Sequence, residues 1–247
     1  MTDQTSSTEQ PTWAKALLAT PSILTRRGLA WGYAEPTEES SVLVLTAKSS
    51  SYVDIRFANE GDPTSPENPD FWAFAGTCDM SLVPGLACTA HGKWSHPIDS
   101  MGLFDNVDEG DMFLLDNGDA IEIGTLENPK TGKVELYKEY WTSPTPEPRT
   151  ASPAVVAKTE DGGKGMIVRV GDYCQGLYQS ADKKQFWVER WTRDGAEGKW
   201  TKDKRSNTAE QDEVDLPSVW AANDSRKEGD ETQAKGRTWR VVEVHKE

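Results

Sequence analysis

The chain has 247 residues, which is enough for one large domain or two small ones with a buried core. Its formal net charge is −14 and its lysines and arginines form no strong cluster, so we expect neither nucleic acid nor an anionic membrane as a partner. No stretch approaches the ~20 apolar residues of a membrane span and the first residues do not resemble a secretory signal, so the expected location is cytoplasmic.

The N-terminal region, residues 1–20, is predicted to be a disordered polar tail followed by a short helix over residues 13–19. Strand patterns then begin. Residues 42–45 form a short apolar run, and residues 52–57 alternate. The alternation places Val53, Ile55 and Phe57 on one face of a strand. The opposite face carries polar side chains: Tyr52, Asp54 and Arg56.

Residues 71–77, with the sequence FWAFAGT, follow a loop that contains three prolines between residues 60 and 70. Three aromatic residues occupy four positions, and the segment then narrows to Ala75 and Gly76. This pattern predicts a buried strand with one large-residue face that ends at a bend near Gly76.

Residues 111–127 are predicted to form a β-hairpin, because Asn117 and Gly118 supply the positive φ of a tight turn between two apolar runs. A further strand covers residues 134–142. Four prolines between residues 143 and 153 then indicate a stiff linker. We therefore place an N-terminal domain at residues 21–143, a linker at 144–153 and a C-terminal domain at 154–247.

The second half repeats the same kinds of element. Strands are predicted over residues 165–170, 173–180, 186–192 and 239–245, with a return strand beginning at 199–201 and a short helix within 216–222. Residues 139–142, with the sequence EYWT, also resemble residues 189–192, with the sequence ERWT. Many short strands without long helices favour two related all-β units, either barrels or sandwiches.

No metal or cofactor motif is found. The three cysteines, Cys78, Cys88 and Cys174, lack zinc-ligand spacing, and their odd number argues against a disulfide framework. His91 and His96 would point to opposite faces of a regular strand, which argues against a shared metal ion. Phosphate-binding loops and nucleophile elbows are also missing. We therefore expect neither a metal nor a cofactor.

At residues 72–77, WAFAGT, the chain resembles the fungal HRI protein family, and weaker blocks agree in order over residues 22–247. The resemblance implies two tandem antiparallel β-barrel domains of the lipocalin or calycin type, with short helices. The family was first named for interaction with a casein-kinase-type protein kinase. Some fungal biosynthetic proteins that resemble it are cofactor-free hetero-Diels–Alder cyclases, which join a tropolone-derived quinone methide to a sesquiterpene. The acidic residues 108–111 and the N-terminal tail depart from the family pattern.

The remaining feature of the sequence that bears on function is its content of ten tryptophans. Singly, each is more readily explained as barrel core, but together they are typical of a barrel that encloses an apolar ligand. The Tyr52, Asp54 and Arg56 face is either a solvated outer face or a polar anchor inside an aromatic cavity. For Glu139 and His91 the same two interpretations remain open: a position on the solvated surface or a position inside the cavity.

Two functional hypotheses follow. In the first, the protein is a cofactor-free cyclase with Tyr52, Arg56 and His91 as catalytic groups, and its substrate-binding residues are Asp54, Trp72, Phe74, Trp94, Glu139 and Trp141. In the second, it is a non-catalytic ligand carrier or a kinase-interacting adaptor with a protein partner or a second copy. The direction in which Tyr52, Asp54 and Arg56 point distinguishes the two.

Overall fold

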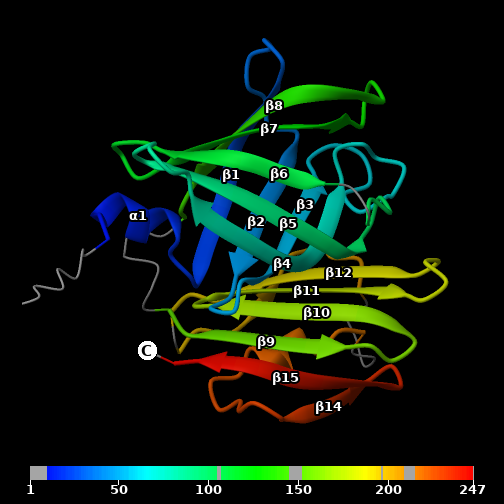
Figure 1. Ribbon diagram of the computed structural model, residues 1–247. Helices are drawn as coiled ribbons and strands as arrows, with labels where there is room; N and C mark the ends of the chain where they lie inside the picture. Colours follow the sequence, from blue (N-terminus) through cyan, green and yellow to red (C-terminus); the bar gives the residue numbers. More distant parts are fainter. Residues whose placement is uncertain (1–9, 105–106, 145–151, 196, 209–214, 247) are drawn as a thin grey trace, which may run out of the picture.

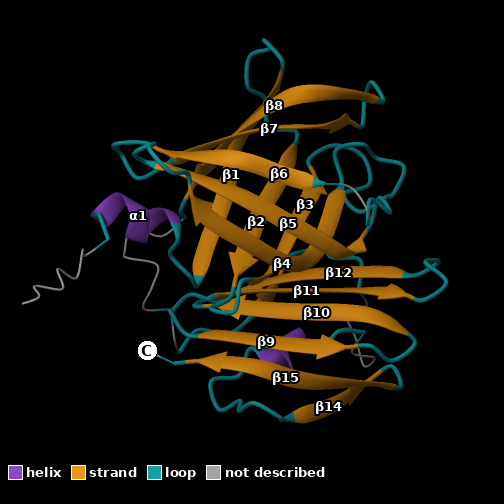
Figure 2. Ribbon diagram, in the orientation of Figure 1, coloured by secondary structure: helices purple, strands orange, loops and turns teal. Residues whose placement is uncertain are grey.

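The computed structural model describes residues 10–104, 107–144, 152–195, 197–208 and 215–246 (Figure 1). Residues 1–9 of the predicted tail and residues 145–151 of the predicted linker lie outside these ranges. Two antiparallel sheets are stacked as two layers, and the described helices are short: α1 (Thr12–Leu17) and α2 (Ser218–Ala221) (Figure 2). The all-β prediction with two tandem barrel-type units is confirmed.

The first sheet is a closed barrel of eight strands in chain order, because β1 pairs with both β2 and β8. Its strands are β1 (Ser22–Trp31), β2 (Ser40–Thr46), β3 (Ser51–Ala58), β4 (Trp72–Leu82), β5 (Thr89–Asp99), β6 (Asp108–Leu114), β7 (Ala120–Asn128) and β8 (Lys133–Thr142). The predicted hairpin is β6–β7, with Gly118 at φ +86° in its turn.

The second sheet is a seven-stranded half-barrel in the order β13-β12-β11-β10-β9-β15-β14. Its strands are β9 (Ala154–Thr159), β10 (Gly163–Val170), β11 (Tyr173–Ser180), β12 (Phe186–Thr192), β13 (Thr201–Lys202), β14 (Glu231–Ala234) and β15 (Arg237–His245). One face packs on the outside of the barrel and the other packs on α2. The helix and its neighbours Leu216 and Ala222 cover that face and pack with Trp239 of β15 in one cluster.

Both faces of β3 are buried, but in different surroundings. This explains why apolar and polar side chains alternate along the strand. Val53, Ile55 and Phe57 are fully buried and belong to the core between barrel and half-barrel. The opposite face of β3 therefore points into the barrel rather than to solvent. The prediction of one apolar and one polar face is confirmed, and the polar face is the inner one.

Polar side chains of the half-barrel hold the two layers together. Arg190 donates to the carbonyl oxygens of Ser41 at 3.1 Å and Ile55 at 2.7 Å. Gln175 donates to those of Leu43 and Val53 at 2.9 and 3.1 Å. Buried charged and amide groups are costly unless they are hydrogen-bonded, so these contacts fix the position of the half-barrel on the barrel.

The segment at residues 71–77 departs from its prediction in one respect. Strand β4 does not end at Gly76 but continues to Leu82, with a register shift between Ala75 and Thr77. A Cβ atom at Gly76 would lie 1.8 Å from the Ser95 carbonyl oxygen. The glycine therefore permits a close approach of β5 at a bulge rather than terminating the strand.

Candidate functional site

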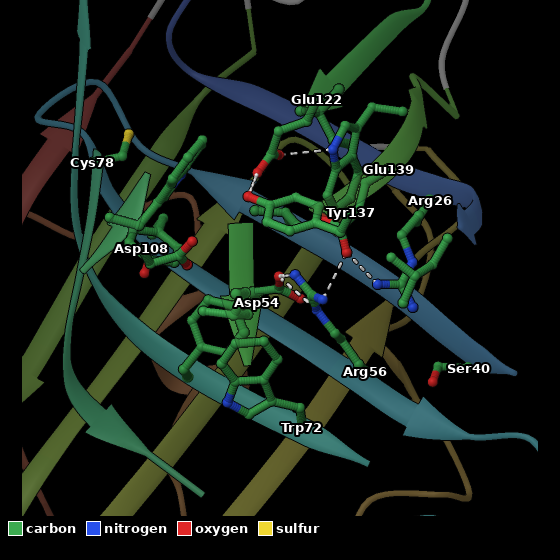
Figure 3. A pocket seen from close by; sticks show the side chains of 18 of the residues that line it. Arg26, Ser40, Asp54, Arg56, Trp72, Cys78, Asp108, Glu122, Tyr137 and Glu139 are labelled. Atoms are coloured by element: carbon green, nitrogen blue, oxygen red, sulfur yellow. Dashed lines mark hydrogen bonds and ion pairs between the residues drawn. The ribbon is translucent and has the colours of Figure 1, made fainter. Parts of the chain in front are cut away.

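The β1–β8 barrel encloses a cavity of about 520 Å³ (Figure 3). This volume falls within the ~300–1,000 Å³ of pockets that hold drug-sized ligands. All eight strands contribute lining residues, and residues 17–20 at the end of α1 add a further part of the wall. The inward positions of the strands therefore carry side chains that can contact a ligand.

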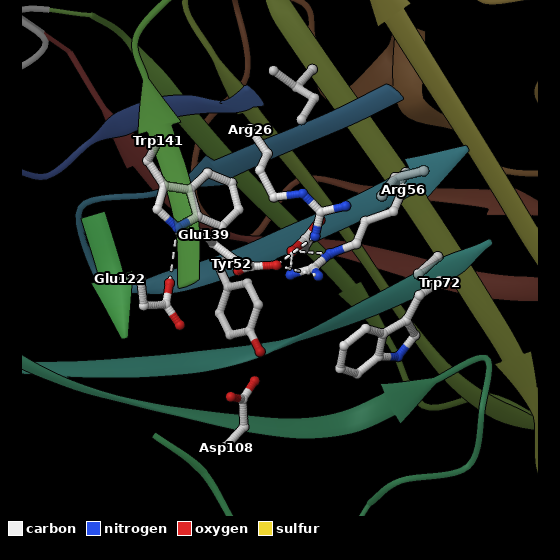
Figure 4. Close-up of polar contacts among 12 residues, drawn as sticks. Arg26, Tyr52, Arg56, Trp72, Asp108, Glu122, Glu139 and Trp141 are labelled. Carbon is white, nitrogen blue, oxygen red and sulfur yellow. Dashed lines mark hydrogen bonds and ion pairs between the residues drawn. The ribbon is translucent and has the colours of Figure 1, made fainter. Parts of the chain in front are cut away.

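A buried ion-pair network centred on Arg56 lies in the wall of the cavity (Figure 4). Nε and Nη2 of Arg56 donate to Asp54 Oδ2 at 3.1 and 2.9 Å, and Nη1 donates to Glu139 Oε1 at 2.9 Å. Burial alone would lower the pKa of Arg56, but Asp54 and Glu139 outweigh it and raise the pKa above its usual value. Arg56 is therefore a permanent cation inside the barrel.

Arg26 on β1 joins the same network. Its Nη1 donates to Glu139 Oε1, and its Nε and Nη2 donate to the two carboxylate oxygens of Glu38 at 2.8 and 2.9 Å. Burial would raise the pKa of Glu139, but Arg56 and Arg26 hold it below its ordinary value. Two arginines thus share one ionised carboxylate, which fixes both guanidinium groups in the cavity wall.

Glu122 on β7 is a second buried carboxyl group with different partners. Its Oε1 accepts a hydrogen bond from the Tyr137 hydroxyl at 2.7 Å, and its Oε2 accepts one from Trp141 Nε1 at 3.0 Å. Burial, and then the charges of Glu139 and Asp108, raise the pKa of Glu122 to about 8. Near neutral pH this group is a protonated acid in the cavity wall, which can donate a proton or a hydrogen bond.

His96 on β5 lies between two carboxylates behind the cavity wall. Its Nδ1 is 3.2 Å from Asp99 Oδ2, and its Nε2 is 2.9 Å from Asp108 Oδ2. Burial would lower the pKa of His96, but Asp108 and Asp99 raise it to about 9. The imidazolium also stacks on Phe74, with ring centroids 4.3 Å apart. It therefore positions both Asp108 and Phe74, which line the cavity.

Aromatic rings form one wall next to these charges. The rings of Trp72 and Phe74 have centroids 4.3 Å apart, and Tyr52 meets Phe74 edge-on at 6.0 Å. The guanidinium carbon of Arg56 lies 4.9 Å from the Trp72 ring centroid. Trp72 Nε1 donates to Asp99 Oδ1 at 3.2 Å, which fixes the plane of the indole. The wall thus offers flat apolar surface at a fixed distance from a buried cation.

The structure brings together eight of the nine residues that the sequence analysis selected. They line the cavity from β3, β4, β5 and β8: Tyr52, Asp54, Arg56, Trp72, Phe74, Trp94, Glu139 and Trp141. The question of whether the polar face of β3 meets solvent is therefore answered, since Asp54 is 3% exposed and faces the cavity. Their catalytic and binding roles stay predictions.

His91 does not belong to this group. It is not among the residues that line the cavity, its side chain is 33% exposed, and it contacts Asp111 at 2.8 Å and Glu109 at 3.6 Å. Strand β5 alternates, and His91 and Lys93 share the outer face while Trp94 lines the cavity. The predicted placement of His91 beside Tyr52 and Arg56 is wrong.

Four important residues of the cavity were not selected from the sequence: Arg26, Asp108, Glu122 and Tyr137. Glu122 carried a usable signal, because it alternates with Ile121 and Ile123 in a predicted hairpin strand. Arg26 and Asp108 carried none, because β1 and the start of β6 are not recognisable from the polar residues around them. Asp108 falls in the acidic segment that is expected from the sequence to depart from the family pattern.

The chain matches the protein family described as Protein HRI1 over residues 22–243. It belongs to this family. The match confirms the family resemblance of residues 72–77. Among solved structures, this HRI1-family protein is similar to the crystal structure of an uncharacterised protein from Saccharomyces cerevisiae, with a TM-score of 0.72 and 18% identity, covering 90% of this chain and 98% of that one. At this identity the similarity shows the fold alone. The curated proteins contain no match.

Within the described ranges of this HRI1-family protein, no three His, Cys, Asp or Glu side chains are grouped so as to hold a metal ion. None of the helices in those ranges is long and apolar enough to span a membrane. All three cysteines are free thiols, and burial raises the pKa of Cys78, which lines the cavity, to about 11. That thiol therefore stays protonated at neutral pH.

Proposed function

We propose that the β1–β8 barrel binds a small molecule that has an apolar body and a polar end. The observation that carries this proposal is the cavity of about 520 Å³, in which an aromatic wall adjoins buried charged side chains. In sites of this kind apolar surface provides affinity and a few fixed polar groups set the orientation of the ligand.

The buried charges support the same proposal because apolar side chains could fill the same space. Buried ion pairs can often be replaced by apolar residues without loss of stability. The α2-covered face of the half-barrel is packed mainly by Ile167, Tyr178 and Trp239, and its buried Arg169 and Glu189 are hydrogen-bonded to packed residues. A barrel that keeps Arg26, Arg56 and Glu139 around open space is better explained by ligand recognition than by packing.

The finer proposal is that the bound molecule undergoes cofactor-independent ring closure, as in fungal specialised metabolism. The reaction is a hetero-Diels–Alder addition of a tropolone-derived quinone methide to a sesquiterpene alkene. One C–C and one C–O bond form from the π electrons of the two reactants, so no oxidant or proton source is consumed. The protein contributes alignment, exclusion of water and hydrogen bonds to the carbonyl oxygen, on which negative charge develops.

Two groups of the cavity support such a role. A guanidinium has five N–H groups, so Arg56 retains donors beyond those that it gives to Asp54 and Glu139. Glu122 carries a proton near neutral pH. The second candidate is a non-catalytic carrier, which the same cavity favours and which differs only in the absence of turnover. An adaptor role toward a protein partner or a second copy rests on the family resemblance.

Intrinsic fluorescence tests ligand binding, because Trp72, Trp94 and Trp141 line the cavity. Apolar terpenes and polyketides should quench or shift the emission at micromolar concentration. Val44→Trp, which fills the cavity, should abolish this response. Val242→Trp is the matched control, because Val242 lies on β15 and is 45% exposed. No response of the wild type to any such compound would overturn the binding proposal.

Turnover tests the ring closure. The protein is incubated with a tropolone precursor that releases a quinone methide and with a humulene-type alkene, and the stereochemistry of the adducts is compared with that of the uncatalysed reaction. Enrichment of one stereoisomer, lost in Val44→Trp, is the expected result. An unchanged mixture in the presence of demonstrated binding would refute catalysis and leave the carrier function.

A further inference from the structure

Both arginines of the cavity are already paired with carboxylates. Nε, Nη1 and Nη2 of Arg26 donate to Glu38 and Glu139. The same three nitrogens of Arg56 donate to Asp54 and Glu139. An anionic ligand would have to displace one of these carboxylates or be buried beside it, and uncompensated like charges are costly in a low-dielectric interior. The arginines therefore do not form a site for a carboxylate or a phosphate.

The buried polar groups in and behind the cavity wall contain a surplus of acids. Four cationic side chains lie in or behind the wall: Arg26, Arg56, His96 and Arg190, the last of which interacts with the charge of Asp54 from behind β3. They meet six carboxyl groups: Glu38, Asp54, Asp99, Asp108, Glu122 and Glu139. With Glu122 protonated, five carboxylates still face the four cations. The local potential is therefore negative, although two arginines lie in the cavity wall.

One oxygen of this group has no hydrogen-bond partner among the residues that the structure describes. Asp54 is 3% exposed; its Oδ2 accepts both hydrogen bonds from Arg56, whereas its buried Oδ1 accepts none. Asp54 lines the cavity (Figure 3). Since buried polar atoms are nearly always satisfied, an unsatisfied carboxylate oxygen in a cavity wall indicates a donor from a bound molecule or from ordered water.

The pKa shifts of neighbouring acidic groups agree with a negative potential in the cavity. Burial, and then the charges of Asp108 and Asp54, raise the pKa of Tyr52 well above its usual value. Burial and the charges of Glu139 and Asp108 act on Glu122 in the same direction. The aromatic wall is compatible with positive charge too, because the Arg56 guanidinium already lies over the rings of Trp72 and Phe74, at 4.9 and 5.2 Å.

We propose that the ligand is an amphipathic amine, whose ammonium group donates to Asp54 Oδ1 and is balanced by the charge of Asp108, with its apolar body against Trp94 and Trp141. A desolvated ammonium is tolerated only where buried carboxylates compensate it, and this cavity supplies them. The inference rests on the binding half of the proposed function and is an alternative to the ring closure, because the quinone methide and the sesquiterpene carry no amino group.

The test uses three probes with the same fifteen-carbon chain: farnesylamine, farnesol and farnesoic acid. Their affinities for the full-length protein are measured at pH 7 by tryptophan fluorescence and by titration calorimetry. The amine should bind at least tenfold more tightly than the alcohol, and the acid should bind most weakly. Asp54→Asn and Asp108→Asn should each reduce the ratio of amine to alcohol affinity at least tenfold while the alcohol still binds.

Glu109→Gln is the matched control, because Glu109 neighbours Asp108 on β6, is 40% exposed and pairs with Lys93 outside the barrel. It removes the same charge and should leave the affinity ratio unchanged. Equal affinity for amine and alcohol, or tighter binding of the acid, would overturn the inference and leave the binding proposal intact. If none of the three probes binds, the binding proposal fails and the inference fails with it. Asp108→Asn alone decides the role of the carboxylates if Asp54→Asn does not fold.

Discussion

Replacing Glu122 by Gln tests whether this carboxyl group is neutral inside the folded barrel. Glu122 is 6% exposed, and burial together with Glu139 and Asp108 raises its pKa from 4.5 to about 8. Between these two values the folded protein holds a proton that the unfolded chain releases. The free energy of unfolding therefore falls as the pH rises through this window, and the penalty is complete above pH 8.

The size of the effect follows from the pKa. A rise from 4.5 to about 8 corresponds to at most about 5 kcal/mol, because each pKa unit is worth about 1.4 kcal/mol. Gln has the shape of the protonated acid, so it keeps an acceptor for Trp141 and offers a donor to Tyr137. Wild type and E122Q should therefore have similar stability near pH 5, and the variant should be more stable by up to about 5 kcal/mol near pH 9.

The assay is urea unfolding from pH 5 to pH 9, monitored by tryptophan fluorescence. The quantity to compare is the free energy of unfolding of E122Q minus that of the wild type at each pH. The stabilising contribution of His96 is also lost as the pH rises, because its pKa is raised to about 9. This loss occurs in both proteins, so it cancels in the difference between their free energies of unfolding. E109Q on the outer face of β6 provides the control for removal of a carboxylate. A difference between E122Q and wild type that does not change with pH would refute the reasoning.

Four further substitutions test the bulge in β4, the contacts between the two layers, and the buried carboxyl groups of the barrel and the half-barrel. Gly76→Ala places a Cβ atom 1.8 Å from the Ser95 carbonyl oxygen, so we expect a loss of about 3 kcal/mol or more in urea unfolding, and wild-type stability would contradict the bulge assignment. Arg190→Met leaves buried carbonyl groups of β2 and β3 without a donor and should cost about 2 kcal/mol or more in the same assay, whereas no change would show that apolar packing alone joins the layers. Glu139→Gln should weaken ligand binding, whereas Glu189→Gln should change stability only; equal effects of both on affinity would contradict a single site in the barrel.

Much of the fold could be predicted from the sequence where one face of a strand is apolar. Residues 42–45, 52–57, 186–192 and 239–245 alternate or run apolar because one of their faces lies in a core, and these strands were predicted. Strands β1, β5, β9 and β14 were not predicted. In β1 and β5 inward residues such as Arg26 and His96 are polar and break the expected alternation. A strand that lines a charged cavity is therefore recognisable only where its outer face is consistently apolar, as that of β3 is.

The candidate site was predictable to the extent that its residues lie on recognisable strands. Once Val53, Ile55 and Phe57 define one face of β3, the positions of Tyr52, Asp54 and Arg56 on the other face follow from the strand repeat. Which face is the interior did not follow, because the half-barrel buries the outer face as completely as the barrel buries the inner one. The sequence around β3 does not indicate that the half-barrel packs on it, because the contacts come from residues more than 100 positions away.

The repeated tetrapeptide shows how similar local sequences come to lie in different surroundings in the two units. In β8, Glu139 and Trp141 face the interior of the closed barrel. In β12, Glu189 and Trp191 occupy the equivalent alternate positions on the α2-covered face, where Thr208 donates to Glu189 at 2.9 Å. The same local sequence thus places a carboxyl and an indole inward in both units. The difference lies in what covers them. The helix α2 and its flanking residues pack onto the half-barrel, whereas closure of β1 on β8 satisfies the barrel edges without an internal helix and leaves a cavity at its centre.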